Sequence, residues 1–258
     1  MRFQDKVAIV TGSGRGIGRE CALGIARQGG KVVVFDLDPD VAEQTAADCK
    51  AAGGGAVSVA GSVSDRDAWK NAIDETHNAF GTIDILINNA GVIAPAMIVK
   101  MTDEQWNTVV DIHMKGTFYG MQAVAPTMIQ RYQRNPNLKS CGKIVNITSV
   151  AGIRGTIGQI NYGAAKAGII GMTMSAAREW GRYRINVNCI GFGTVETRMT
   201  EVIRTDPRFA ERTRSQIAMG YIAEPSDVAP AVLFLAHEDA NYVTGHTINC
   251  SGGSHIGF

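Results

Sequence analysis

The sequence lacks the features of disulfide-stapled, membrane-spanning and nucleic-acid-binding proteins. Its five cysteines are scattered without a C-x-x-C pair, so we expect buried free thiols and a reducing compartment. No apolar run approaches a membrane span, and the N-terminus leaves no room for a signal peptide before the first strand. A net charge of +1 offers no basic excess to a nucleic acid, and the histidines show no metal-ligand spacing. These absences predict a cytoplasmic globular protein without metal, membrane or nucleic-acid partner.

What the sequence has is a regular alternation of short apolar strands and longer helices. Strands are expected at 6–11, 31–36, 56–61, 83–88, 143–148, 184–190 and 246–250. Helices are expected at 17–29, 39–52, 65–80, 103–133, 160–181 and 226–237, and a surface loop at 131–142. Strands that are apolar on both faces and alternate with helices indicate a parallel sheet with helices on both faces. The pattern predicts one doubly wound α/β domain over residues 1–258 with about seven strands.

A glycine-rich stretch, TGSGRGIG at 11–18, lies between the first expected strand and the first helix. Gly12, Gly16 and Gly18 would let the backbone approach a pyrophosphate at the helix N-terminus. Asp36 ends the second strand, where an acid hydrogen-bonds the ribose hydroxyls of a dinucleotide. The alternative is an ordinary turn followed by an unrelated surface acid.

The charges near this loop bear on the choice of dinucleotide. Arg15 could meet a ribose 2′-phosphate, or it could be a solvated loop residue. Asp36 would repel that phosphate, and like charges at close range cost several kcal/mol. We therefore expect NAD(H) to be preferred over NADP(H).

Tyr162 and Lys166, four residues apart in NYGAAKAG, would share one face of a helix among small residues. A phenol is a weak base near neutrality, and a neighbouring ammonium lowers its pKa. Tyr162 could then exchange a proton with an alcohol or ketone oxygen. The alternative is a surface tyrosine beside a solvated lysine, because this spacing is common in helices.

Five motifs together resemble the short-chain dehydrogenase/reductase family over essentially the whole chain. They are TGSGRGIG (11–18), NNAG (88–91), NITS (146–149), YGAAK (162–166) and TVETRM (194–199). The resemblance implies a Rossmann fold and a catalytic serine thirteen residues before the tyrosine, here Ser149. It is closest to the branch that resembles 3-oxoacyl-acyl-carrier-protein reductase, because GQINY (158–162) and EPSDVAPAVLFLA (224–236) match that branch.

The resemblance also implies the remaining site residues. Lys166 would bind nicotinamide ribose hydroxyls, and Val195 and Thr197 would contact the carboxamide. The full set of expected cofactor contacts is Gly12, Ser13, Arg15, Gly16, Ile17, Gly18, Asp36, Leu37, Ser62, Val63, Asn89, Ala90, Gly91, Tyr162, Lys166, Val195 and Thr197. The expected substrate contacts are Gln159, Phe192 and Met199, the last in a variable segment at about 197–220.

Three positions depart from the family pattern. Ser62 stands where an Asp usually meets the adenine, and Phe192-Gly193 stands where Pro-Gly is usual. His113 stands where an Asn usually supports the proton relay, so we include it among the catalytic candidates. A histidine could substitute by donating from one ring nitrogen and accepting at the other.

These observations predict an NAD(H)-linked oxidoreductase that interconverts a ketone and a secondary alcohol. A 3-oxoacyl thioester is the first expectation for the substrate, and a small polyol, sugar or cyclic alcohol is the alternative. A dinucleotide-binding regulator without turnover is the alternative from another class. The resemblance implies a homotetramer with a dimer interface on the long fourth and fifth helices. Four cations could meet an acidic carrier protein or form a solvated face: Arg131, Arg134, Lys139 and Arg178.

Overall fold

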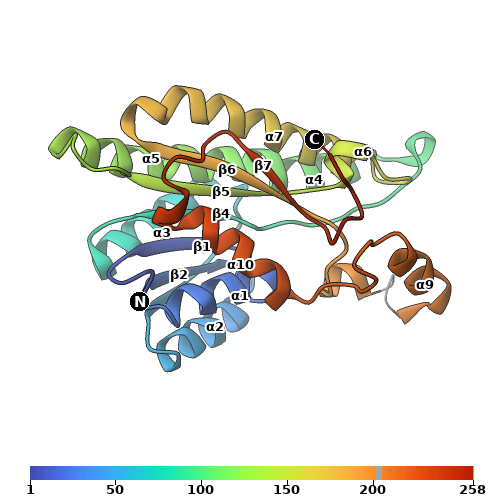
Figure 1. The fold of residues 1–258 in the computed structure, drawn as a ribbon, viewed down its shortest axis with the longest axis horizontal. Helices are drawn as coiled ribbons and strands as arrows, with labels where there is room; N and C mark the ends of the chain where they lie inside the picture. Colours follow the sequence, from blue (N-terminus) through green and yellow to red (C-terminus); the bar gives the residue numbers. More distant parts are fainter. Residues whose placement is uncertain (202–204, 258) are drawn as a thin grey trace.

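The computed structural model describes residues 1–201 and 205–257 and contains one seven-stranded parallel sheet (Figure 1). The strand order is β3-β2-β1-β4-β5-β6-β7, which confirms the doubly wound α/β fold. The strands are β1 (Val7–Thr11), β2 (Lys31–Asp36), β3 (Gly55–Ala60), β4 (Ile85–Asn88), β5 (Gly142–Ser149), β6 (Ile185–Phe192) and β7 (Thr247–Cys250).

The order of the strands explains where a ligand site can form. β1 pairs with β2 on one side and with β4 on the other, so the chain winds first one way and then the other from β1. The helices that follow β1 and β4 therefore lie on opposite faces of the sheet. In open parallel sheets ligands bind outside the carboxyl ends of the strands at this switch point.

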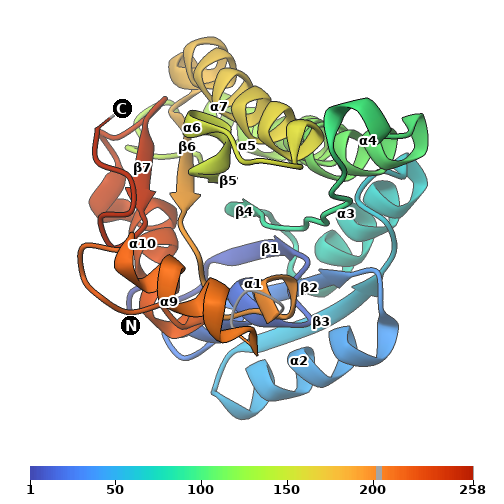
Figure 2. The same cartoon turned by 90° about the vertical axis from the view of Figure 1, so that its right-hand side faces the viewer.

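Helices cover both faces of the sheet, as expected from strands that are buried throughout β1, β4 and β6 (Figure 2). One core contains residues of α1 (Gly16–Ala26), α2 (Pro39–Ala51) and α10 (Pro225–Ala236). The other core contains residues of α3 (Arg66–Phe80), α5 (Gly116–Arg134) and α7 (Ile160–Trp180). Short 3₁₀ turns complete the connections at Ile98–Lys100, Gly181–Tyr183, Arg198–Thr200 and Glu238–Ala240.

The long helix expected at 103–133 is divided into three segments. α4 (Asp103–Val110) leads into one π-helical turn at Asp111–Lys115, and α5 follows. π-Helical turns inside α-helices are frequent at functional sites. His113, the departure from the family pattern, lies in this turn.

Three parts of the chain differ from the expectations. α6 (Ala151–Arg154) and α9 (Pro207–Ser215) were not expected, and both lie beyond the same end of the sheet in Figure 1. The expected loop at 131–142 is partly wrong, because α5 continues to Arg134. Residues 202–204 of the variable segment lie outside the described residues.

Three findings on the described residues concern disulfides, membrane spans and metal sites. All five cysteines are free; Cys21, Cys49, Cys141 and Cys189 are buried, and Cys250 is half-buried. Across residues 1–201 and 205–257, no helix has the length and apolar character needed to cross a bilayer. The same residues contain no group of three or more His, Cys, Asp or Glu side chains suited to a metal ion.

Candidate active site

The glycine loop between β1 and α1 packs too closely for side chains. Gly12 has a φ of +59°, and a Cβ there would lie 2.8 Å from Cα of Ala90. A Cβ on Gly18 would collide with the carbonyl oxygen of Gly12. Gly16 has a φ of +54°, in the region that favours glycine. These positions explain the glycines of TGSGRGIG by backbone geometry.

The first turn of α1 fits a dinucleotide pyrophosphate. Arg15, at the N-cap, makes no side-chain cap, and no acidic residue occupies the first turn. The first amides of a helix have no intrahelical partner and attract anions. The start of α1 thus has backbone donors for an anionic ligand, whereas the Gly12 and Gly14 amides within the loop are already bonded to Phe35 and Asp36.

The NNAG turn after β4 is bonded directly to this loop. The Asn89 side chain donates to the carbonyl oxygens of Thr11 and Gly12, both at 3.0 Å. The Thr11 hydroxyl accepts from the backbone amides of Asn89 and Ala90, also at 3.0 Å. The motif therefore holds the loops after β1 and β4 together at the switch point.

Asp36 lies against the glycine loop, and a second acid sits beside it. Asp36 accepts from the Gly14 amide at 2.8 Å and from the Asp38 amide at 3.2 Å. Arg15 forms an ion pair with Asp38 at 2.5 Å. We had not singled out Asp38, although an acid just before Pro39 at the start of α2 is an N-cap signal. Because Arg15 is paired with Asp38, its charge is already neutralised at the place where it could have met a 2′-phosphate.

The other expected cofactor contacts are spread around the loop. Ser13 is buried and donates to the carbonyl oxygen of Val10 at 2.6 Å, whereas Leu37 is 72% exposed. The Ser62 hydroxyl bonds that of Ser64 at 2.9 Å. Thr197 reaches the loop from β6, because a Cβ on Gly16 would lie 3.5 Å from its Cγ2. Three further expected contacts are Ile17, Val63 and Val195. Ile17 lies in α1, whereas Val63 and Val195 follow β3 and β6 and are buried.

Ser149 and Tyr162 meet at the carboxyl end of β5. The Ser149 hydroxyl donates to the carbonyl oxygen of Phe192 at 3.3 Å and accepts from the Ala151 amide at 3.2 Å. Burial raises the pKa of Tyr162, and its hydrogen bond with Ser149 acts in the opposite direction. The phenol thus remains protonated at neutral pH in the protein alone.

Lys166 lies below the tyrosine ring and does not contact its hydroxyl. Its Nζ donates to the carbonyl oxygen of Ile147 at 2.8 Å and lies 5.5 Å from the centre of the Tyr162 ring. Burial lowers the pKa of Lys166 to about 8. The expectation that Lys166 lowers the pKa of Tyr162 is wrong for the protein alone, because burial of the phenol dominates.

Two residues that we had not singled out hold this arrangement. The Thr148 hydroxyl donates to the carbonyl oxygen of Lys166 at 2.6 Å. Asn161 is fully buried and donates to the carbonyl oxygens of Ala94 and Gln105, both at 2.9 Å. The only sequence signal for Asn161 was its place in GQINY, just before the tyrosine.

His113 is buried against the tyrosine. Its ring meets the Tyr162 ring edge to face, with 5.2 Å between centroids. Nε2 lies 2.8 Å from the Val92 oxygen and 3.1 Å from the Val92 nitrogen, while Nδ1 is buried without a partner among the described residues. Burial first, and then the charge of Lys166, place the pKa of His113 well below 6.5.

The three expected substrate contacts differ in how accessible their side chains are. Gln159 precedes α7 and pairs with Ala96 of the loop after β4. Met199 is 38% exposed at the start of the variable segment. Phe192 is 5% exposed within the core, so its ring offers little surface to a substrate and its carbonyl oxygen serves Ser149 instead.

One predicted surface residue is structural. Arg131 forms an ion pair with Asp84 at 2.9 Å and donates to the carbonyl oxygens of Ile83 and Cys141. Its side chain is 21% exposed. The interpretation of Arg131 as a solvated charge is therefore wrong, and its contact with a carrier protein stays a prediction.

Comparisons with known proteins agree with this geometry. A family model described as enoyl-(acyl carrier protein) reductase matches residues 12–255. The chain is 38% identical over 253 residues to 3-oxoacyl-[acyl-carrier-protein] reductase FabG of Thermotoga maritima, covering 98% of this chain and 99% of that protein. The corresponding protein of Staphylococcus epidermidis is 37% identical, over 98% of this chain and all of that protein.

A further relative is named for a different activity. It is the (2S)-[(R)-hydroxy(phenyl)methyl]succinyl-CoA dehydrogenase subunit BbsD of Thauera aromatica, 36% identical over 254 residues and 98% of each chain. These relatives match almost the whole chain. The chain belongs to the short-chain dehydrogenase/reductase family and is an oxidoreductase.

Proposed function

We propose that this protein is an NAD(H)-linked oxidoreductase that interconverts a ketone and a secondary alcohol, with a 3-oxoacyl thioester as substrate. The observation that carries the proposal is the meeting of Ser149, Tyr162 and Lys166 at the carboxyl end of β5. They lie on the edge of the sheet that also holds the glycine loop. A proton donor and a dinucleotide cradle on one edge are what hydride transfer to a carbonyl requires.

The roles of the three residues follow from their contacts. Ser149 would turn its hydroxyl proton from the Phe192 carbonyl to the substrate carbonyl oxygen and hold that oxygen beside Tyr162. Tyr162 would give its proton to that oxygen as the ketone becomes an alcohol. Lys166 would bind ribose hydroxyls with the donors that the Ile147 carbonyl leaves free. The nicotinamide, when bound, supplies or accepts the hydride.

The state of Tyr162 favours the reductive direction. Because burial raises its pKa, the phenol carries its proton at neutral pH and can act as a general acid. Alcohol oxidation needs the phenolate, which burial opposes.

The choice of NAD(H) rests on two acids rather than one. Asp36 is fixed by the Gly14 amide, and Arg15 is already paired with Asp38. A 2′-phosphate at this place would meet Asp36 and find its nearest loop cation neutralised. Unfavourable contacts of like charges give specificity against the wrong ligand.

The thioester class rests on the relatives. An acyl group on an acyl-carrier protein and one on CoA are both thioesters, and the relatives' printed names contain one or the other. The test is a panel of 3-oxoacyl thioesters, simple ketones, polyols and cyclic alcohols, assayed in both directions with NADH or NAD. The thioesters should give the highest kcat/KM; a polyol above them would contradict the substrate.

The same experiment separates the enzyme from a regulator. A titration of NADH fluorescence, run beside the panel, measures binding without turnover. A sensor would bind NADH and turn over no substrate across the panel. We expect both binding and turnover, because a sensor has no need of a positioned proton donor.

We also propose a homotetramer. Phe118 on α5 and Met174 on α7 are 43% and 49% exposed, in the helices expected to form a dimer interface. Large exposed apolar side chains on neighbouring elements are typical of such interfaces. Light scattering after size exclusion tests this; a monomer at micromolar concentration would contradict it.

A further inference from the structure

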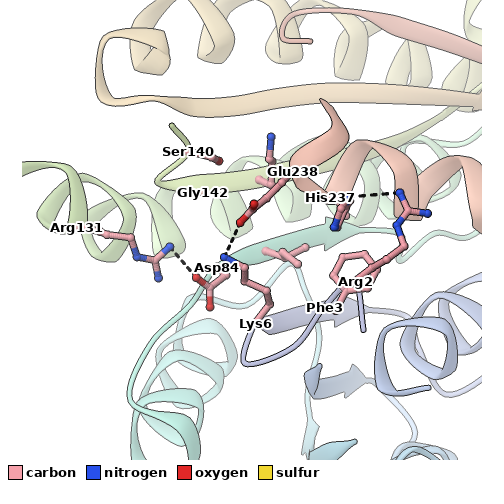
Figure 3. Close-up of a pocket in the computed structure, with 12 residues that line it drawn as sticks. Arg2, Phe3, Lys6, Asp84, Arg131, Ser140, Gly142, His237 and Glu238 are labelled. Atoms are coloured by element: carbon pink, nitrogen blue, oxygen red, sulfur yellow. Dashed lines mark hydrogen bonds and ion pairs between the residues drawn. The ribbon is translucent and has the colours of Figure 1, made fainter. Parts of the chain in front are cut away.

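A cavity of about 30 Å³ lies at the amino edge of the sheet, opposite to the active site (Figure 3). It is lined by residues near the starts of β1, β4 and β5 and by the end of α10. From Lys143 to Ser149 β5 spans roughly 20 Å at a strand's rise per residue, so the cavity is no part of the catalytic site.

Four cations line this cavity, and three of them are ion-paired. Lys6 pairs with Glu238 at 3.0 Å, and Arg131 pairs with Asp84 at 2.9 Å. The third, Arg2, pairs with Asp239. Figure 3 shows the contacts of Lys6 and Arg131 directed across the cavity to their acids.

Lys143 is the exception. It is 4% exposed, the least exposed of the four, and its Nζ donates to the Asn186 side-chain oxygen at 2.9 Å. No carboxylate within the described ranges pairs with it. An ammonium has three donors, so this contact leaves two donors unused, and the carboxylate that acts on Lys143 from a distance, Glu238, is already paired with Lys6. Buried charges are usually paired, because desolvation of an isolated ion is costly.

We propose that the cavity beside Lys143 is a binding site for one small monovalent anion. The volume of the cavity limits which anions can bind in it. A water needs about 10–15 Å³ of such volume, so the cavity holds an ion of one to three heavy atoms. A halide or formate fits this limit, whereas phosphate and sulfate do not.

The surrounding charges set the strength. The anion adds a negative charge beside Lys143, whose pKa is lowered first by burial, raised by Glu238 and lowered again by Lys6. Glu238 and the carbonyl end of α10 oppose the anion. We therefore expect a dissociation constant on the order of millimolar.

The test is thermal unfolding in chloride, formate and sulfate at constant ionic strength and pH 7, for the full chain and for Lys143→Met. Salts act on stability generally, so the specific effect is the difference between the two proteins. Chloride and formate should raise the melting temperature of the unmodified protein by about 2–4 °C more than that of the variant. Sulfate should shift both equally.

Lys31→Met is the matched control, since Lys31 also begins a strand at this edge and lies over the Phe80 ring. It should keep the full chloride response. Raising the pH to about 10 should remove the response from the unmodified protein, because Lys143 then loses its proton.

A direct readout does not depend on the variants. Crystals of the unmodified protein soaked in bromide should show one anomalous peak in contact with Nζ of Lys143. A cavity without bromide, or equal chloride responses in the unmodified protein and Lys143→Met, overturns the proposal. These results leave the proposed reaction at the other edge of the sheet unaffected.

Discussion

Two buried lysines, one at each edge of the sheet, have the same acidity and opposite surroundings. Burial lowers the pKa of Lys143 and of Lys166 to about 8. Each donates to one neutral oxygen, of Asn186 at 2.9 Å and of Ile147 at 2.8 Å. Lys166, at the carboxyl edge, lies near the Tyr162 phenol and on the same edge as the glycine loop. Lys143, at the amino edge, lies beside the cations of three ion pairs.

The comparison shows that a perturbed lysine does not by itself mark a catalytic site. Structural networks also shift pKa values, so the inference needs groups that can act on a substrate. Ser149 and Tyr162 are such groups and belong to Lys166 alone. Lys143 has cations and acids in fixed pairs, which suit a bound ion and supply no proton donor to a substrate.

The largest expected effect removes the phenol from the carboxyl edge. Tyr162→Phe keeps the ring and should lower kcat by about 10²–10⁴-fold, the usual contribution of general acid–base catalysis. NADH affinity, measured by fluorescence, should change little. Lys143→Met and Tyr132→Phe, which removes a hydroxyl remote from the site, should keep normal turnover with the preferred thioester. If Lys143→Met lost as much activity as Tyr162→Phe, the distinction between the two edges would be wrong.

The next effect concerns the dinucleotide cradle, which only the carboxyl edge contains. Asp36→Ala removes the carboxylate that would repel a 2′-phosphate and should raise the ratio of NADPH to NADH kcat/KM by about tenfold or more. Asp40→Ala is the control, because Asp40 lies on the first turn of α2 and its backbone amide contacts Asp38. A higher kcat/KM with NADPH than with NADH in the unmodified protein would refute the cofactor assignment.

The fold and the site's outline could be predicted because their signals are local. Strand and helix periodicity located all seven strands within two residues of their observed bounds. The glycine loop was recognisable because its glycines are close together in the sequence. Tyr162 and Lys166 were recognisable because they are four residues apart, which places them on one face of a helix. The π-helical turn around His113 was not recognisable, since it interrupts a continuous helical pattern without a Pro or Gly.

What the sequence could not show depends on residues far apart in the chain. Arg131 follows the apolar part of α5 in a polar stretch, and only the fold brings Asp84 to it. Small residues near Tyr162 serve packing, because a Cβ on Gly168 would lie 2.6 Å from the Met114 side chain. Burial of Tyr162, which reverses the expected direction of its pKa, is likewise a tertiary property.

A smaller effect is expected at His113, the histidine between Tyr162 and the Val92 backbone. One imidazole nitrogen faces both the N–H and the C=O of Val92, and it can serve only one of them at a time. We propose that His113 positions Tyr162 as a neutral ring. Its pKa lies well below 6.5, so the ring stays neutral at pH 7 and becomes charged only in acid. An unfolded histidine binds a proton more readily, so stability falls as the pH drops below 6.5.

The measurement is a pH–rate profile for His113→Asn beside the unmodified protein, with His77→Asn as the control for the same change elsewhere. Above pH 7 the Asn variant should lie within about tenfold of the unmodified enzyme. At pH values well below 6.5, where His113 of the folded enzyme takes up its proton, the Asn variant should retain more of its neutral-pH activity. Coincident profiles at every pH would remove His113 from the mechanism. A gain of about one hundredfold at neutral pH would show that the histidine is a defect.

The smallest effect tests the amino edge through stability. Lys143 has a pKa of about 8 in the folded protein and 10.5 as its ordinary value. Between these pH values the unfolded chain binds the proton and the folded chain does not, so stability rises with pH. The rise amounts to about 1 kcal/mol between pH 8 and 9. Lys143→Met should remove that part of the slope in urea unfolding, whereas Lys31→Met should keep it.

The slope must be compared between proteins, because other groups also change stability with pH. Lys166 adds its own rise in stability, and the buried Cys21 and Cys189, with pKa values raised to about 12, lower the stability above pH 9. An unchanged slope in Lys143→Met would mean that Lys143 keeps its proton to a pH near 10.5, and hence that the amino edge already compensates its charge.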